Sequence, residues 1–282
     1  MQWYFLALSS LFLFSLSSIF QRRLLSKTSL NPVIYGFTFQ VLVGILAIPI
    51  FFYKPGTING DLTTWFYILL ASVFYAFSNF LLFWGIKFLE ISQVSIIGST
   101  KSFWVLIGSA IILSETVTST KILGVALIIL ALLVIIVKGV KVKPSKGQLF
   151  ILGATVFSAA AYVLDGLILK DFSASFYLII SSLATGFGTL AISPKSASKI
   201  KELFNKSVLT WTIFISAIFS LAVYMLYYSY QVGGTISSLI PITQTATILT
   251  VVLAAIFLKE TSNLPRKIVA AIISFIGILL LR

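Results

Sequence analysis

The sequence contains no cysteine and no histidine. It therefore cannot form a disulfide bond, a thiolate or imidazole metal site, or a catalytic Ser–His or Cys–His pair. We expect no metal and no cofactor. Acidic residues are also scarce, with only seven Asp and Glu along the chain. A membrane-embedded enzyme would need acids clustered near one membrane face, so it is the remotest of the functions considered for this sequence. We predict no catalytic residue.

Charged residues make up only 10% of the 282 residues, while hydrophobic residues make up 59% and the mean hydropathy is +1.09. Soluble domains carry roughly 25% charged residues. So few charges cannot cover a water-facing surface, and lipid must therefore be the solvent for most of the chain. The sequence also lacks the Gly-rich loop and lysine of an ATP-binding site, which argues against ATP-driven transport.

Ten apolar stretches follow one another along the chain. Each is close to the ~20 residues that cross a bilayer as a helix, and the connections are too short for a soluble domain. We predict an all-α, multi-pass protein of the plasma (inner) membrane with ten transmembrane helices. The predicted helices are Gln2–Phe20, Pro32–Tyr53, Thr64–Ile86, Ser92–Leu113, Ile122–Val137, Gln148–Leu169, Ser175–Ile192, Leu209–Tyr230, Ser237–Leu258 and Ile268–Leu281.

The two halves of the sequence resemble each other at an almost constant offset. A shift of 145 residues places Ser92–Val137 on Ser237–Arg282, and a shift of 144 places Gln21 on Asp165. Five helices per half is an odd number, so the halves must lie in opposite orientations. We predict two inverted five-helix repeats, 1–137 and 148–282, joined by a basic linker, 138–147. Inverted repeats place the solute site near the middle of the membrane, between the halves.

Two matching runs carry a resemblance to a known family. The first is Phe83–Ser92 before a helix that ends in Leu113–Thr116, and the second is Tyr227–Gly234 before a helix that ends in Leu258–Thr261. Both are similar to the EamA-type branch of the drug/metabolite transporter superfamily, over essentially the whole chain. The resemblance implies a five-plus-five inverted bundle that moves metabolites, amino acids or drugs by alternating access.

One departure from this family concerns proline. Members often have a proline in the middle of the fourth and ninth helices, where this sequence has Ser102 and Thr247. The helix break that the resemblance implies therefore lacks its usual residue. Pro241, six residues before Thr247, could supply a break in the ninth helix.

Lys101 and Asp165 are the charged residues well inside predicted helices. An unpaired cation at the bilayer centre costs about 3 kcal/mol, so Lys101 should face a polar cavity together with Thr100. We interpret Lys101 as the group that meets a carboxylate or phosphate of a solute, or that exchanges a proton; alternatively it snorkels or contacts carbonyl groups. Asp165 either binds a cation or a coupling proton, or it simply ends its hydrophobic span or pairs with Lys170.

Uncharged polar residues inside the predicted helices are further candidates for solute binding. Gln244 and Thr247 lie in the ninth helix, Asn79 in the third and Gln40 in the second. Their amide and hydroxyl groups can satisfy the donors and acceptors of a solute. The alternative is hydrogen bonding between helices, which contributes under ~1 kcal/mol per contact in membranes.

Aromatic residues are candidates for the wall of a pocket. Tyr224, Tyr227 and Tyr228 recur at i, i+3 and i+4, so we predict that they share one helix face, and Trp84 occupies the matching block of the first half. They could stack on a ring or enclose a cation. The alternative is the aromatic belt at the membrane interface, above all for Tyr228 and Trp84.

Glu115 and Glu260 follow the fourth and ninth helices. Inverted halves put them on opposite faces of the membrane, so they cannot form a paired-carboxylate site. We expect each to cap the next helix or to pair with Lys121 and Arg266, respectively.

The formal net charge is +13, and its cations lie mostly in loops. Loops after odd-numbered helices hold 15 Lys and Arg, and the other side holds four. No aromatic residues interleave them, so we expect orienting charge at a lipid bilayer and no nucleic-acid partner. The positive-inside rule then predicts both termini outside, whereas the family resemblance implies both inside.

We conclude that the sequence predicts a secondary transporter for a small metabolite that carries a carboxylate or phosphate, for example an amino acid. The predicted solute site consists of the polar and aromatic candidates above, centred on Lys101. An exporter of neutral or cationic amphiphilic compounds, with Lys101 as a gate, is the alternative. Substrate identity, direction, coupling ion and oligomeric state do not follow from the sequence.

Overall fold

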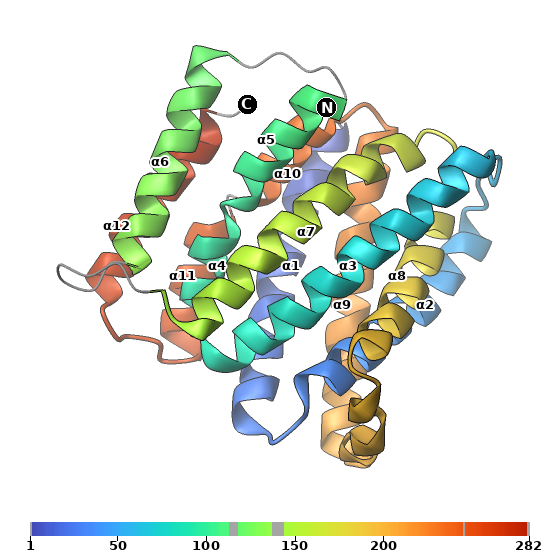
Figure 1. Cartoon of the computed structure of the whole chain (residues 1–282), viewed down its shortest axis with the longest axis horizontal. Helices are drawn as coiled ribbons and strands as arrows, with labels where there is room; N and C mark the ends of the chain where they lie inside the picture. Colours follow the sequence, from blue (N-terminus) through green and yellow to red (C-terminus); the bar gives the residue numbers. More distant parts are fainter. Residues whose placement is uncertain (1, 113–117, 137–143, 245, 281–282) are drawn as a thin grey trace.

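The computed structural model describes residues 2–112, 118–136, 144–244 and 246–280 (Figure 1). Within these ranges the chain is helical, and the one extended pairing is an isolated bridge between Ile58 and Phe172. The first half forms α1 (Gln2–Lys27), α2 (Pro32–Tyr53), α3 (Leu62–Phe88), α4 (Ile91–Gly98), α5 (Lys101–Ile112) and α6 (Ser119–Ile136). The second half forms α7 (Lys146–Ile168), α8 (Ala174–Ile192), a 3-10 helix (Pro194–Phe204), α9 (Lys206–Gln231), α10 (Ile236–Gln244), α11 (Ala246–Phe257) and α12 (Leu264–Leu279).

Capping side chains fix where several helices begin. Asn31 accepts the backbone N–H of Val33 at the start of α2, where Pro32 occupies the first helical position. Asp61 accepts the N–H of Thr64 in α3. Ser145 and Gln148 form a reciprocal capping box at the start of α7. These caps explain why the observed starts lie within about two residues of the predicted ones.

Among the described residues, seven helices are long and apolar enough to cross a membrane, when α4 and α5 are counted as the single span Ile91–Ile112. The others are α1, α2, α3, α7, α8 and α9; shorter apolar segments occur at Ser119–Ala131 and Ile242–Phe257. The structure thus supports a multi-pass protein, and the number of ten spans stays a prediction. Two boundaries need correction above all. The helix α1 continues past Phe20 to Lys27, and α12 begins at Leu264 instead of Ile268, so Arg22, Arg23, Arg266 and Lys267 are helical residues and not loop residues.

The predicted fourth helix, drawn as one continuous element over Ser92–Leu113, is broken. It divides into α4 and α5 at Ser99 and Thr100, without a proline. The hydroxyls of Ser99 and Thr100 donate to the carbonyls of Ile96 and Ile97, each at 2.7 Å. These local hydrogen bonds compete with the helix ladder and end α4 shortly before Ser102, the position where the resemblance implies a proline. The predicted ninth helix corresponds to α10 and α11, and Thr245 between them lies outside the described residues.

Helices from the two halves pack against each other throughout the bundle. The main pairs are α3 with α7, α2 with α8, α1 with α9 and α6 with α12. Exchange of the halves turns the pair α1–α9 into α7–α3 and leaves the other two pairs unchanged. Small residues permit the α2–α8 approach, since a Cβ atom on Gly186 would lie 3.1 Å from the carbonyl oxygen of Phe37.

Candidate functional site

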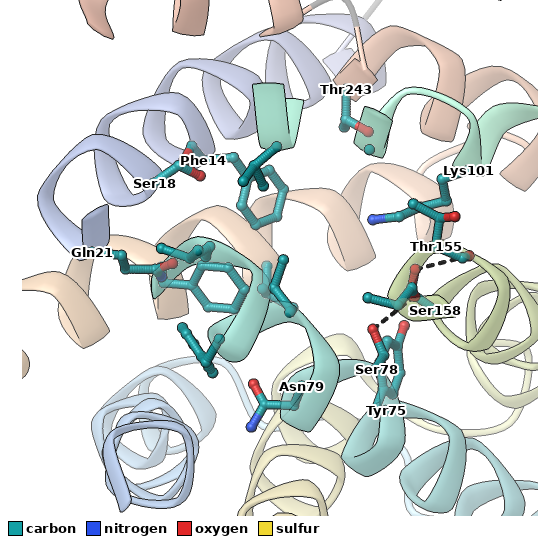
Figure 2. Close-up of a pocket in the computed structure, with 18 of the residues that line it drawn as sticks. Phe14, Ser18, Gln21, Tyr75, Ser78, Asn79, Lys101, Thr155, Ser158 and Thr243 are labelled. Atoms are coloured by element: carbon teal, nitrogen blue, oxygen red, sulfur yellow. Dashed lines mark hydrogen bonds between the residues drawn. The ribbon is translucent and has the colours of Figure 1, made fainter. Parts of the chain in front are cut away.

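A cavity of about 250 Å³ lies inside the bundle (Figure 2). Its described lining residues come from α1 to α5 and from α7 to α11, so both halves contribute, while α6 and α12 do not. Five of the ten predicted site residues lie on its wall. They are Lys101, Gln244, Asn79, Gln40 and Tyr227.

Lys101 is the cation of this wall. The break after α4 makes it the first residue of α5, and its ammonium group extends into the cavity (Figure 2). Nζ lies 5.1 Å from the centre of the Tyr162 ring, and it forms no hydrogen bond or ion pair with the described residues. The N-terminal end of a helix carries a partial positive charge, which adds to that of the lysine. This position therefore favours an anionic group in the cavity.

Amide groups form a second polar part of the wall. The Asn79 amide donates to the hydroxyl of Thr189 at 2.9 Å, and its oxygen accepts a long hydrogen bond of 3.4 Å from Gln40. These contacts tie α3 to α8 and α2, so part of the hydrogen-bonding capacity of Asn79 serves the packing of helices. Gln244 lies in α10 and lines the cavity beside Thr243.

The other five predicted residues do not line the cavity. Thr100 donates to the carbonyl of Ile97, and Thr247 donates to that of Gln244 at 2.9 Å, so both hydroxyls bond to the backbone three residues earlier in the chain. Trp84 stacks on Phe88 with ring centres 5.7 Å apart.

The predicted tyrosine face of α9 divides into two parts. Tyr224 and Tyr228 stack on each other with ring centres 5.8 Å apart, and the ammonium of Lys54 donates to the Tyr228 hydroxyl. Lys54 lies just after α2, so this pair belongs to one end of the bundle, as the aromatic-belt alternative predicts. Only Tyr227 of the three lines the cavity.

Several wall residues were missed from the sequence. Hydroxyl groups of both halves line the cavity, including Ser18, Ser78, Thr155, Ser158, Ser181 and Ser182, together with Gln21, Tyr75 and Tyr162. One signal could have revealed part of them, because Thr155, Ser158 and Tyr162 recur at i, i+3 and i+7 along α7. Isolated serines elsewhere carry no such pattern.

Asp165 lies behind the cavity wall and is completely buried, at 0% exposure. Its carboxylate accepts hydrogen bonds of 2.5 Å from the hydroxyls of Tyr75 in α3 and Tyr177 in α8. It forms no ion pair with the residues that the structure describes, so the alternative pairing with Lys170 does not occur.

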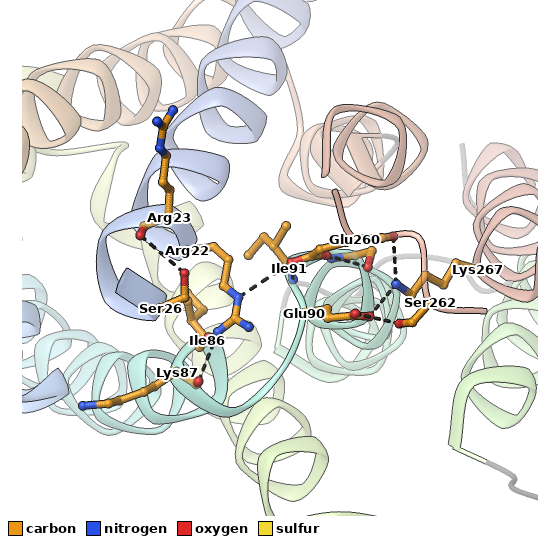
Figure 3. A network of polar contacts seen from close by, with 11 residues as sticks. Arg22, Arg23, Ser26, Ile86, Lys87, Glu90, Ile91, Glu260, Ser262 and Lys267 are labelled. Carbon is orange, nitrogen blue, oxygen red and sulfur yellow. Dashed lines mark hydrogen bonds and ion pairs between the residues drawn. The ribbon is translucent and has the colours of Figure 1, made fainter. Parts of the chain in front are cut away.

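A polar network lies next to the cavity-lining residues Ile86 and Ile91 (Figure 3). The Arg22 guanidinium, on α1, donates to the carbonyls of Ile86 and Lys87 at the end of α3, at 2.7 and 3.1 Å. Glu260, after α11, accepts the N–H of Ile91 at 2.9 Å and both the N–H and the hydroxyl of Ser92. Since Ile86 and Ile91 also line the cavity, the network holds its wall from outside.

Glu260 therefore does not act as predicted. It caps α4 of the other half instead of the helix that follows it, and it pairs with Arg22 and not with Arg266, which donates to the carbonyl of Val134. A second ion pair joins Glu90 to the buried Lys267, and Ser262 donates to Glu90 at 2.7 Å. The matching residue of the first half, Glu115, lies outside the described residues.

The model of the EamA-like transporter family matches this chain twice, over residues 1–137 and 145–282. The chain belongs to the EamA-like transporter family. This confirms the resemblance to the drug/metabolite transporter superfamily that the two matching runs indicate. The EamA-like chain is thus a multi-pass membrane transporter of small molecules, in agreement with the seven apolar spans in the described part of the chain and with the expectation that it is not an enzyme.

A solved crystal structure has the same fold as this EamA-like chain. The superposition has a TM-score of 0.63 at 14% sequence identity and covers 95% of this chain and 98% of the other. At this identity the likeness shows the fold alone. A search of curated proteins finds no match.

Proposed function

We propose that the chain is a secondary transporter that carries a small solute with a carboxylate or phosphate group by alternating access. The observation that carries the proposal is the Lys101 ammonium, which faces a cavity walled by both halves and has no described anionic partner. A cation in a membrane interior costs free energy unless an anion or water accompanies it. An anionic solute would supply that partner.

The proposed architecture is ten transmembrane helices in two inverted repeats, 1–137 and 148–282, with 138–147 as the linker. Two observations support it: the family model matches once in each half, and α1 packs on α9 as α7 packs on α3. In inverted repeats, alternating access is a rocking of one half against the other around a fixed site. The cavity between the halves suits this movement.

The size and composition of the cavity support a small metabolite. Its volume of about 250 Å³ lies below the ~300–1,000 Å³ typical of sites for drug-sized ligands. Lys101 would bind the anionic group, while Gln244, Asn79, Gln40 and nearby hydroxyls would take up the remaining donors and acceptors. An amino acid or a related compound fits this chemistry. A coupling proton is the additional partner that we propose for the transport cycle.

The second candidate is an exporter of neutral or cationic amphiphilic compounds. Aromatic rings favour it, because Phe14, Phe39, Phe83, Phe219 and Tyr227 line the same cavity. In that case Lys101 acts as a gate and makes no contact with solute charge.

A thermal-shift screen followed by uptake into proteoliposomes tests the proposal. A ligand that binds the folded state raises the apparent melting temperature by mass action, so we would screen amino acids, sugar phosphates, nucleotides and quaternary amines. We expect carboxylate or phosphate compounds as hits. Uptake of the hit should fall in Lys101→Ala and persist in Lys170→Ala, an exposed control lysine. Undiminished uptake of every anionic hit in Lys101→Ala would overturn the anion proposal.

A further inference from the structure

Asp165 is a buried acid that has no role in the proposed binding of the solute. It lies near the end of α7, and its carboxylate is inaccessible to solvent. Such a group normally has a cation or several hydrogen-bond donors, because an isolated buried charge is costly. Here the described partners are phenol hydroxyls alone.

Four tyrosines from four helices surround this carboxyl group. Tyr75 and Tyr177 donate to its two oxygens. Tyr227 of α9 also interacts with it and packs on Tyr177 with ring centres 5.2 Å apart. Tyr162, one turn before Asp165, packs on Tyr75 at 5.8 Å. The fifth polar neighbour is Lys101 of α5, which reaches the cluster through the Tyr162 ring.

The cluster is continuous with the solute cavity. Tyr75, Tyr162 and Tyr227 all line the cavity, whereas Asp165 and Tyr177 do not. Any rearrangement of the hydroxyls around Asp165 therefore changes the wall that a solute meets.

We propose that Asp165 is a proton-binding site, and that Tyr75 passes its protonation state to the solute cavity. The inference rests on the proposed transport function and adds to it the residue that carries a coupling proton. An ionised carboxylate only accepts hydrogen bonds, so it holds both tyrosine hydroxyls as donors. When hydronium transfers a proton to a carboxylate oxygen and leaves as water, that oxygen gains an O–H group that donates to the tyrosine oxygen, and the tyrosine turns its own O–H away. No other covalent bond forms or breaks.

Tyr75 is the hydroxyl that can respond. It is only partly buried and faces the cavity, so its released O–H can donate to a solute or to cavity water. Tyr177 is fully buried and does not line the cavity, so its O–H cannot turn toward a solute there. Protonation of Asp165 thus adds a hydrogen-bond donor to the cavity, near Lys101, and couples proton binding to solute binding.

An infrared pH titration of the full chain in liposomes, without any solute, tests this proposal. A protonated carboxylic acid has a carbonyl band that the carboxylate lacks, and seven acids are few enough for one band to be resolved. We expect a titrating band that disappears in Asp165→Asn and remains in Asp171→Asn, the matched control. Tyrosine ring bands should change at the same midpoint in the wild type and not in Asp165→Asn.

Tyr75→Phe keeps the experiment informative if Asp165→Asn does not fold. This variant leaves the acid in place and removes one of its donors, so the midpoint of the band should shift while Tyr162→Phe changes it less. The proposal is wrong if the titrating band is still present in Asp165→Asn, or if the tyrosine bands do not change during the titration. Because no solute is present, failure here leaves the transport proposal standing, and failure of the uptake assay leaves this result intact.

Discussion

The guanidinium of Arg22 lies 3.7 Å from the carboxylate of Glu260, which joins α1 of the first half to the loop after α11 of the second. Each partner also bonds the backbone of a residue that lines the cavity, Ile86 and Ile91 respectively. The ion pair thus lies directly behind the cavity wall at this end of the bundle. We infer that this end opens only when these contacts separate.

Arg22→Gln should loosen this end, whereas Arg23→Gln should not. Both variants lose one charge, but the Arg23 side chain is exposed and points away from the network (Figure 3). Loss of a charged hydrogen bond costs about 1.5–3 kcal/mol. We expect a lower melting temperature and faster maleimide labelling of Ser95→Cys, which lines the cavity, in the Arg22 variant alone. Equal labelling rates in the two variants would show that the network does not hold this end of the bundle closed.

Lys101→Met should raise stability while it removes anion binding. The ammonium has no anionic partner among the described residues, so its loss relieves a desolvation cost. We expect a higher melting temperature, together with a roughly 10–100-fold weaker affinity for the anionic hit, the value of one charged hydrogen bond. Lys54→Met, at the exposed end of α2, serves as the control. A lower melting temperature in Lys101→Met would show that the lysine has a structural partner.

Two glycines of the cavity region should respond oppositely to alanine. A Cβ atom on Gly36 would lie 2.9 Å from both the amide nitrogen of Asn79 and the Phe83 ring, whereas one on Gly98 meets nothing within 4 Å. Overpacking costs typically about 1–3 kcal/mol, while an unstrained helical Gly→Ala change gains about 0.5–1 kcal/mol. Thermal unfolding should therefore show a lower melting temperature for Gly36→Ala and an unchanged or higher one for Gly98→Ala. The reverse order would contradict the packing around Asn79.

Asp61 should make part of the stability pH-dependent. The backbone N–H and then the hydroxyl of Thr64 donate to its carboxylate and lower the pKa of Asp61. A lowered folded-state pKa adds stability above the usual carboxyl pKa of about 4, and this stability is lost as the pH falls through the folded value. Asn is a comparable helix cap without the charge. Asp61→Asn should thus have a lower melting temperature than the wild type at neutral pH, and the two melting temperatures should converge in acid.

Several features of the fold follow directly from the sequence. The bounds predicted for the second helix are those of α2, because Asn31 and Pro32 start it and a loop rich in polar residues ends it. The burial cost of a cation was enough to predict a polar environment for Lys101. Its place on the cavity wall agrees with that argument.

Contacts between the halves could not be predicted in the same way. Glu260 caps α4 across 168 residues of sequence, and no local pattern identifies such a partner. The break before Lys101 depends on Ser99 and Thr100, whose hydroxyls are common in unbroken helices as well. For Asp165 the sequence left a cation or proton site and the end of a hydrophobic span as alternatives, because its tyrosine partners come from two other helices, and Tyr75 is 90 residues away.

Side-specific labelling of Ser95→Cys tests the central claim, alternating access to the cavity, most directly. The chain has no native cysteine, so this residue would be the single reactive thiol. The measurement is the rate of its reaction with a membrane-impermeant maleimide, added to either side of proteoliposomes of known orientation, with and without the anionic hit. We expect reaction from both sides. The hit should change these rates when Ser95→Cys is the only substitution, and it should leave them unchanged when Lys101→Ala is also present. Reaction from one side only, whatever the solute, would contradict it.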